Sequence, residues 1–185
     1  DAVVGNGTAA SCTEAAFDSA LTTAQTGGGT ITFNCGPAVA TIPFSLVKIV
    51  NLGNVTIDGG DRIILNANNN DRHFFAGSGV TFRLRAITLR DGSSLVGGGA
   101  IEASGADVIL DDVDLINNYA AASGGAIYCF DGTLTINGAL LVKTFGREQH
   151  ELGRYRAIAG NVRDIGSRRA RVGKRVFAVF IIRDP

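Results

Sequence analysis

The sequence predicts an all-β chain, a right-handed single-stranded parallel β-helix of about five rungs with an N-terminal capping α-helix. A short pattern recurs at steps of 24, 25, 28 and 26 residues, with a large apolar residue on each side of a middle residue that is usually Thr. The phrase Gly-Gly-Ala-Ile occurs twice, at 98–101 and 124–127. Twenty-five glycines against three prolines suit many tight turns between short strands.

Aligned segments predict three faces in each turn. Alternation along a strand places the two apolar residues of each segment inside and the middle residue outside. The first face then has two inward columns, namely Ile31, Val55, Val80, Val108 and Leu134, and Phe33, Ile57, Phe82, Leu110 and Ile136. The second face aligns Leu65, Leu89, Leu115 and Leu141, and the third aligns Phe74, Ile101 and Ile127, with Ala76, Ala103 and Cys129 beside them. Glycines 97–99 and Asn117 and Asn118 fall at corners between faces.

A single helix is expected ahead of the strands, over residues 12–26. Ser11 and Glu14 have the spacing of a capping box, and Gly27 begins the run of glycines that ends the helix. One apolar stripe follows at helical spacing, made of Phe17, Ala20, Leu21 and Ala24. We expect this helix to cover the first rung, and the alternative is a helix that binds a partner.

Charge divides the chain into a β-helix domain at 1–145 and a basic tail at 146–185. The first part has seven Lys and Arg against thirteen Asp and Glu, and the second has ten against four, so the net charges are near −6 and +6. The tail is read as a C-terminal cap, an assembly segment or a misread region. Its aromatics are few, so we expect it to dock on an acidic protein surface rather than on nucleic acid. The apolar run near its end predicts a strand that closes the last rung or pairs with another molecule, with Val176, Phe177, Val179, Phe180 and Ile181 as assembly residues.

Cysteine usage indicates an extracellular or cell-surface protein. Cys12 precedes the predicted helix and Cys35 follows the first core strand, so a disulfide between them would join the cap to the strands. Cys129 is expected to be a buried thiol. The sequence has no run of 18 apolar residues, and it begins at Asp1 without Met, as a processed secreted protein or a trimmed chain would. Asn6 and Asn54 begin N-glycosylation triplets, whose occupancy stays open.

Candidate chemistry is confined to charged residues of the outer face. Asp58, Arg83, Asp111 and Asn137 each follow the inward pair of their segment, which predicts a ladder of alternating charge. Asp111, Asp112 and Asp114 form the tightest carboxylate cluster, a weak candidate for Ca²⁺, and otherwise a solvated face. His73 and His150 have no companion at metal-ligand or triad spacing, and we expect no cofactor.

Two stretches carry a family resemblance. Leu115-Ile-Asn-Asn-Tyr-Ala-Ala-Ala-Ser-Gly-Gly-Ala-Ile-Tyr128 resembles the repeat of chlamydial polymorphic outer-membrane proteins and of bacterial surface proteins with β-helical passengers. The stretch from Ser11-Cys-Thr-Glu-Ala-Ala16 to Ile31-Thr-Phe-Asn-Cys-Gly36 is similar to the N-terminal cap of large secreted proteins of this kind. Val55-Thr-Ile-Asp-Gly-Gly60 is similar to a scaffold phrase of pectate lyases, and it brings no catalytic residue with it. The resemblance covers roughly residues 1–145 and implies a pectate-lyase-like β-helix.

The first functional expectation is a secreted or cell-surface structural or adhesive protein, with self-assembly end to end into filaments as one form of that role. The alternative is a carbohydrate-active enzyme, a polysaccharide lyase or hydrolase. In that reading Asp111, Asp112 and Asp114 lie near Ca²⁺, and Arg83 or Arg85 acts as base or charge neutraliser. A third reading is a solenoid that binds glycans along the outward Thr56, Thr81 and Thr135.

Overall fold

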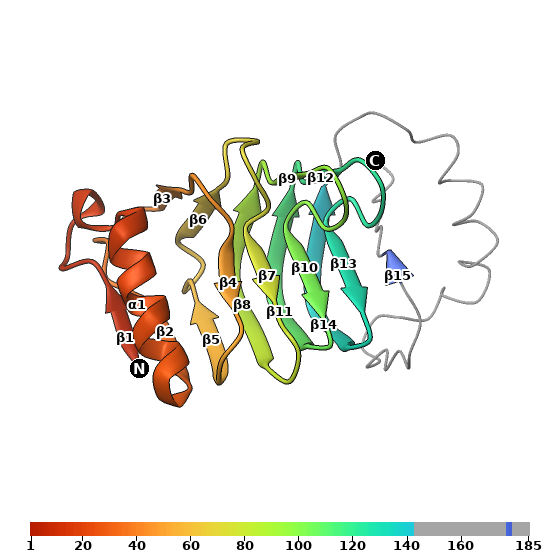
Figure 1. The fold of residues 1–185 in the computed structure, drawn as a ribbon. Helices are drawn as coiled ribbons and strands as arrows, with labels where there is room; N and C mark the ends of the chain where they lie inside the picture. Colours follow the sequence, from red (N-terminus) through yellow and green to blue (C-terminus); the bar gives the residue numbers. More distant parts are fainter. Residues whose placement is uncertain (143–176, 179–185) are drawn as a thin grey trace.

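Parallel strand pairing dominates the structure, a computed structural model that describes residues 1–142 and 177–178 (Figure 1). One α-helix, α1 (Glu14–Gly27), follows a short 3-10 helix, η1 (Ala9–Ser11). The strands are β1 (Ala2–Val4), β2 (Gly29–Phe33), β3 (Ala40–Pro43), β4 (Lys48–Val50), β5 (Asn54–Asp58), β6 (Ile63–Asn66), β7 (Phe74–Ala76), β8 (Thr81–Arg90), β9 (Ser93–Ser94), β10 (Ile101–Ser104), β11 (Asp107–Ile116), β12 (Tyr119–Ala120), β13 (Ile127–Phe130), β14 (Thr133–Val142) and β15 (Phe177–Ala178).

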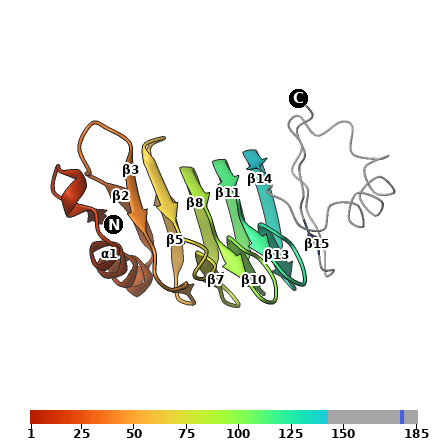
Figure 2. The same ribbon diagram turned by 90° about the horizontal axis from the view of Figure 1, so that it is seen from above.

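The strands form three main ladders, and from β2 onward successive segments of the chain belong to the first, second and third ladder in turn. The first ladder runs β1-β2-β5-β8-β11-β14, and the second joins β3 and β6 to the later halves of β8, β11 and β14. The third ladder is β4-β7-β10-β13. Every pairing among these strands is parallel, as is the short β9–β12 pair. Figure 2 shows the strands side by side in a stack with α1 at its N-terminal end.

Long strands serve two ladders because each contains one residue that does not join the pairing. Ala86 in β8 and Asp112 in β11 have left-handed φ angles of 46° and 51°. Asp111 pairs with Arg85 and Val113 with Ile87, so the two left-handed residues lie at equivalent positions between the paired segments. A residue of this kind bends the strand, and the segments before and after it then belong to different faces.

The predicted side-chain columns are confirmed for two of the three faces. Leu65 pairs with Leu89, Leu89 with Leu115, and Leu115 with Leu141. Ile101 pairs with both Phe74 and Ile127, and the small column of Ala76, Ala103 and Cys129 stacks beside them. Leu65, Leu89, Phe74 and Ile101 have no exposed surface, so these columns are the core.

The predicted register of the first face is correct between β11 and β14 and wrong elsewhere by two residues. Val108 pairs with Leu134 as predicted, but Val55 pairs with Phe82 and Ile31 with Ile57. A slip of two residues keeps every side chain on its own side of the sheet, so alternation alone cannot detect it. Val80-Thr-Phe82 and Phe82-Arg-Leu84 both fit the apolar pattern. Val108 pairs with Phe82 on one side and with Leu134 on the other. The observed column therefore consists of Gly29, Val55, Phe82, Val108 and Leu134. Its steps are 26, 27, 26 and 26 residues, which are more regular than the predicted steps.

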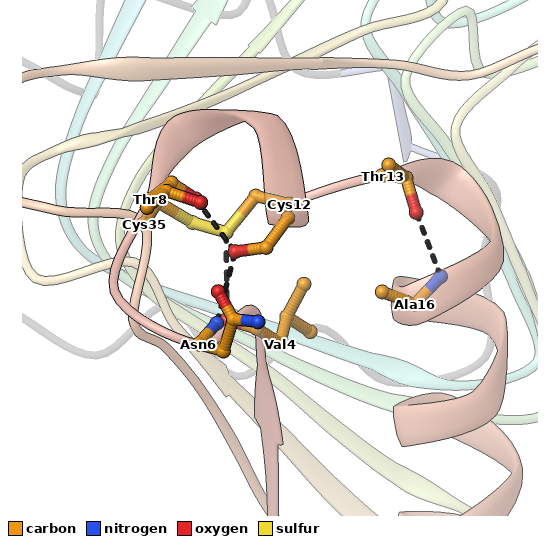
Figure 3. Close-up of a disulfide and its surroundings, with 8 residues drawn as sticks. Val4, Asn6, Thr8, Cys12, Thr13, Ala16 and Cys35 are labelled. Atoms are coloured by element: carbon orange, nitrogen blue, oxygen red, sulfur yellow. Dashed lines mark hydrogen bonds between the residues drawn. A yellow bond between two sulfur atoms is a disulfide. The ribbon is translucent and has the colours of Figure 1, made fainter.

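The helix covers the start of the stack, and its N-cap differs from the predicted one. Thr13 caps α1 by accepting a hydrogen bond from the Ala16 amide at 3.2 Å. Ser11 instead ends η1, where its hydroxyl donates to the Thr8 carbonyl and accepts from the Asn6 amide (Figure 3). The predicted capping box is therefore wrong, because the third helical residue after the Thr13 N-cap is Ala16 and the Glu14 carboxylate binds Ser45 and Lys48 instead. The predicted apolar stripe is buried: Phe17, Ala20, Leu21 and Ala24.

An aromatic cluster and an ion pair join α1 to the strands. The Phe17 ring lies 4.9 Å from that of Phe44 and 6.2 Å from that of Phe74, between centroids. Lys48, only 7% exposed, places its ammonium 2.6 Å from Glu14 and 2.8 Å from Asp18. The helix is therefore held to the sheet by apolar packing and by a partly buried charge cluster.

The predicted disulfide between Cys12 and Cys35 is present. The two Cα atoms lie 5.7 Å apart, and the bond joins residues 23 positions apart in the sequence. Figure 3 shows it beside η1, close to the end of β1 at Val4. Cys129 is a buried free thiol as predicted, and burial raises its pKa.

The basic tail lies outside the described residues except for β15. Phe177 pairs antiparallel with Cys129, and Ala178 with Tyr128. This pairing places part of the predicted terminal strand at the edge of the third ladder. The other proposed assembly residues, Val176, Val179, Phe180 and Ile181, are not described. No helix in the described ranges has the length and apolar character that a membrane crossing requires.

Candidate functional site

The outer face of the first ladder carries the predicted alternation of charge, with one arginine exchanged for another. Asp58 pairs with Arg85, Arg85 with Asp111, and Asp111 with Asn137. Arg83, the predicted member, lies instead between Thr56 and Ile109. The two-residue slip in register is the cause, since it moves Arg83 and Arg85 together along the same outward face.

Both oxygens of Asp111 are bound by neighbouring strands. Arg83 Nη1 donates to Asp111 Oδ2 at 2.9 Å, and Asn137 Nδ2 donates to Asp111 Oδ1 at 2.6 Å. Arg85 Nη1 lies 3.5 Å from Asp58 Oδ2. The arginine side chains are 44% and 62% exposed, so solvent weakens these pairs and each contributes well under 1 kcal/mol. Their effect is to neutralise the carboxylates and to oppose strand slippage.

The predicted carboxylate cluster of Asp111, Asp112 and Asp114 does not converge. Asp112 is the exposed left-handed residue at the bend of β11, and Asp114 lies beyond the bend, paired with Thr88 in the second ladder. Within residues 1–142 and 177–178, no three His, Cys, Asp or Glu side chains come together as they would around a metal ion. The bend separates three carboxylates that are almost consecutive in the sequence.

The predicted threonine row is also interrupted. Thr56 and Thr135 lie on one line of the outer face, but Arg83 and Ile109 stand between them. Thr81 lies two positions away in the register, opposite Asp107. A flat row of hydroxyl groups for a glycan is therefore absent from this face over β5, β8, β11 and β14.

A buried polar corner is the feature that the sequence did not reveal. Asn118 Oδ1 accepts the Gly92 amide at 2.8 Å, and Asn118 Nδ2 donates to the Leu89 carbonyl at 3.0 Å. Asp91 accepts hydrogen bonds from Asn117 at 3.0 Å and from Arg90 at 2.7 Å. The asparagines were predicted at a corner, and the glycine and aspartate they bind come from the preceding turn of the chain.

His73 lies in the same corner and has no exposed surface. Its Nε2 lies 3.0 Å from the Leu65 carbonyl oxygen, and its Nδ1 has no hydrogen-bond partner among the described residues. Burial lowers the pKa of His73 to about 4, although the carbonyls of Leu65 and Arg90 and the charge of Asp91 act to raise it. The imidazole is therefore neutral at pH 7.

A groove of about 570 Å³ opens near the disulfide. It is lined by residues 32–38, which run from the end of β2 through Cys35 to Ala38, and by residues 58–60, 62 and 63 at and after the end of β5. Asp58 and Arg62 bring charge to the groove, and Phe33 and Pro37 bring apolar surface. The groove has room for a small molecule, and the carboxylate of Asp58 is already engaged by Arg85 and by the Gly60 amide.

With this geometry in hand, the chain was compared with known proteins. No protein-family model, curated protein or solved structure matches it. The resemblance to β-helical surface proteins therefore remains an expectation based on the sequence motifs alone.

Proposed function

We propose that the chain is a secreted or cell-surface structural or adhesive protein whose three ladders close into a right-handed single-stranded β-helix. The regular steps of 26 and 27 residues support this, because each step brings the chain back to the next strand of the same ladder. The Cys12–Cys35 disulfide supports an oxidising compartment.

Pairing of charge across β5, β8, β11 and β14 is the observation that carries the proposal. Both carboxylate oxygens of Asp111 accept hydrogen bonds from side chains of neighbouring strands, and Asp58 forms an ion pair with Arg85. A general acid, a base or a Ca²⁺ ligand needs a carboxylate that can reach the substrate or the ion. Carboxylates that bind the next strand instead stabilise the stack, which suits a scaffold better than a catalytic groove.

Self-association at the β14 end is the form of this role that we favour. β14 pairs with β11, and no strand of the described residues lies on its other side. An open parallel edge is a template for another strand, and contacts between unlike ends of a stack do not close into a ring. β15 covers part of the β13 edge, which favours closure of the third ladder by the chain's own terminal strand.

Light scattering and electron microscopy of the purified full chain test the proposal. We expect an apparent mass that grows with concentration, and filaments at the highest concentrations. A protein that stays monomeric throughout contradicts self-association. A parallel incubation with polyuronates and Ca²⁺ addresses the enzyme alternative, with Asp111→Asn as the matched variant. Unsaturated product that Asp111→Asn abolishes would contradict the structural role.

A further inference from the structure

Among the described residues, one nitrogen of the enclosed His73 imidazole has no hydrogen-bond partner. A carbonyl oxygen only accepts hydrogen bonds, so the contact with Leu65 places the proton on Nε2 and leaves Nδ1 with an unused lone pair. The Phe44 and Phe74 rings lie 6.2 and 6.4 Å away, between centroids. Buried polar atoms are nearly always hydrogen-bonded, which makes this nitrogen an exception that calls for an explanation.

Gly92 packs closely against Nδ1. A Cβ atom at Gly92 would come within 2.8 Å of His73 Nδ1 and 2.7 Å of Asn118 Oδ1, and it would collide with the Gly99 carbonyl. The Asn118 oxygen already accepts the Gly92 amide. A proton added to Nδ1 would therefore place a positive charge among neutral oxygens, namely the Arg90 carbonyl and the Asn118 amide oxygen that already binds Gly92, with no carboxylate free to balance the charge among the described residues.

Within residues 1–142, the charged groups around His73 are already paired with other side chains or backbone groups. Asp91, 8% exposed, is bound by Arg90 and Asn117. Arg72 precedes His73 in the chain and forms an ion pair with Glu102. The other charged groups that the structure places near this turn are Asp71, whose carboxylate accepts the Arg72 amide, and Lys48, whose ammonium is held by Glu14 and Asp18.

We propose that His73 is an acid-sensitive latch: when it takes up a proton, the corner around Gly92 and Asn118 opens while the ladders on either side stay folded. The latch is independent of the function proposed above, because it rests on the corner alone. The pH range in which the latch opens is set by the weak proton affinity of the enclosed imidazole. That range lies below the ordinary value of 6.5 and reaches down to about 4.

Opening would release hydrogen bonds that join two turns of the chain. The Gly92 amide would leave Asn118, and the Tyr119 amide would leave the Gly92 carbonyl, now 2.8 Å away. β9 and β12, which pair over two residues, meet beside this corner. The loop after β9 carries Leu95, 88% exposed, and Val96, 62% exposed, so acid would give this apolar loop more freedom.

Hydrogen exchange of the full chain, corrected for the intrinsic pH dependence of exchange, tests the latch. If the open corner has an ordinary histidine and the closed one a histidine of pKa about 4, the open population rises on the order of 20-fold from pH 7 to pH 5. We expect this increase at residues 91–94 and 117–120. Exchange in the middle of β11 should stay unchanged over the same range.

His73→Gln is the decisive variant, because an amide can still donate to Leu65 and does not titrate. It should abolish the pH-dependent increase, whereas His150→Gln, the matched change at the other histidine, should keep it. Equal increases in wild type and His73→Gln would overturn the proposal, as would wild type with no increase down to pH 4. If His73→Gln does not fold, the NMR titration of the wild-type imidazole decides the question. Its protonation must coincide with opening of the corner, and opening while His73 stays neutral would overturn the latch.

Discussion

Individual side chains in this chain act mostly by joining one turn to the next. Glu14 shows this clearly, because its carboxylate accepts hydrogen bonds from Lys48 Nζ and from the amide and hydroxyl of Ser45. Partial burial acts to raise the pKa of Glu14, but the bonds from Lys48 and Ser45 outweigh burial and lower the pKa to about 2. The capping helix is therefore attached through a carboxylate that has to be ionised.

Acid should weaken this attachment within a defined range. Because the pKa of Glu14 is about 2 in the folded chain and 4.5 when unperturbed, its contribution is complete above about pH 4.5 and is lost as the pH falls toward 2. Glu14→Gln should lower the free energy of unfolding by about 1–2 kcal/mol at pH 7 and by little at pH 2.5. Urea unfolding at the two pH values measures this. An equal loss at both would contradict the role of the charge.

Gly92 matters because backbone and side chains close on it from several directions. Gly92→Ala would force its methyl group against the Gly99 carbonyl, the Asn118 side chain and the His73 ring. We expect a loss of about 3 kcal/mol or more, since backbone has to move. Gly27→Ala is the matched control, because nothing beyond its chain neighbours and its own helix backbone lies within 4 Å of the added methyl. Similar thermal unfolding temperatures for the two variants would contradict the close packing of the corner.

The N-terminal elements depend on a covalent link as well as on packing. The disulfide ties η1, just ahead of α1, to the segment that follows β2. Closing a loop of this length stabilises the folded state by about 3 kcal/mol in the chain-entropy description. The double variant Cys12→Ser and Cys35→Ser should lose about that amount, measured by urea unfolding. Reduced wild type should match it, and an unchanged midpoint in either case would contradict this role.

Elements whose neighbours repeat the same residue type were the ones that the sequence could predict. The leucine column of the second ladder and the isoleucines of the third were aligned correctly, because the same residue type recurs at the paired position in successive strands. The first ladder offered two matches near Phe82, and a slip of two residues preserves alternation. The helix was placed correctly within two residues, while Thr13 and Ser11 are alternative caps that spacing alone does not separate.

Sites formed between turns were beyond sequence analysis for a different reason. The corner brings His73 together with Leu65, Gly92 and Asn118, which are far apart in the chain and share no motif. The prediction of a carboxylate cluster was wrong for the opposite reason. Asp111, Asp112 and Asp114 are adjacent in sequence, and the left-handed bend at Asp112 turns them to different faces. Proximity in sequence was a poor guide in both cases.

Over residues 1–142 the molecule consists of parallel strand ladders with a single α-helix at their N-terminal end. Its core columns continue from turn to turn, and the charged residues of the outer face join the same strands from outside. This arrangement makes the register of the strands the property on which the outer face depends. A shift of two residues between β5 and β8 would replace the pairing of Asp58 with Arg85 by one with Arg83.

The register between β5 and β8 is therefore the most direct test of this account. Two double-cysteine variants are compared in a Cys129→Ser background, with the native disulfide kept intact. One joins Thr56→Cys to Arg83→Cys, which are partners in the structure, and the other joins Thr56→Cys to Thr81→Cys, the partners that simple alignment favours. Under mild oxidation, mass spectrometry should find the 56–83 cross-link formed rapidly and the 56–81 cross-link formed slowly or not at all. Preferential formation of the 56–81 cross-link would contradict the stacking and the charge ladder built on it.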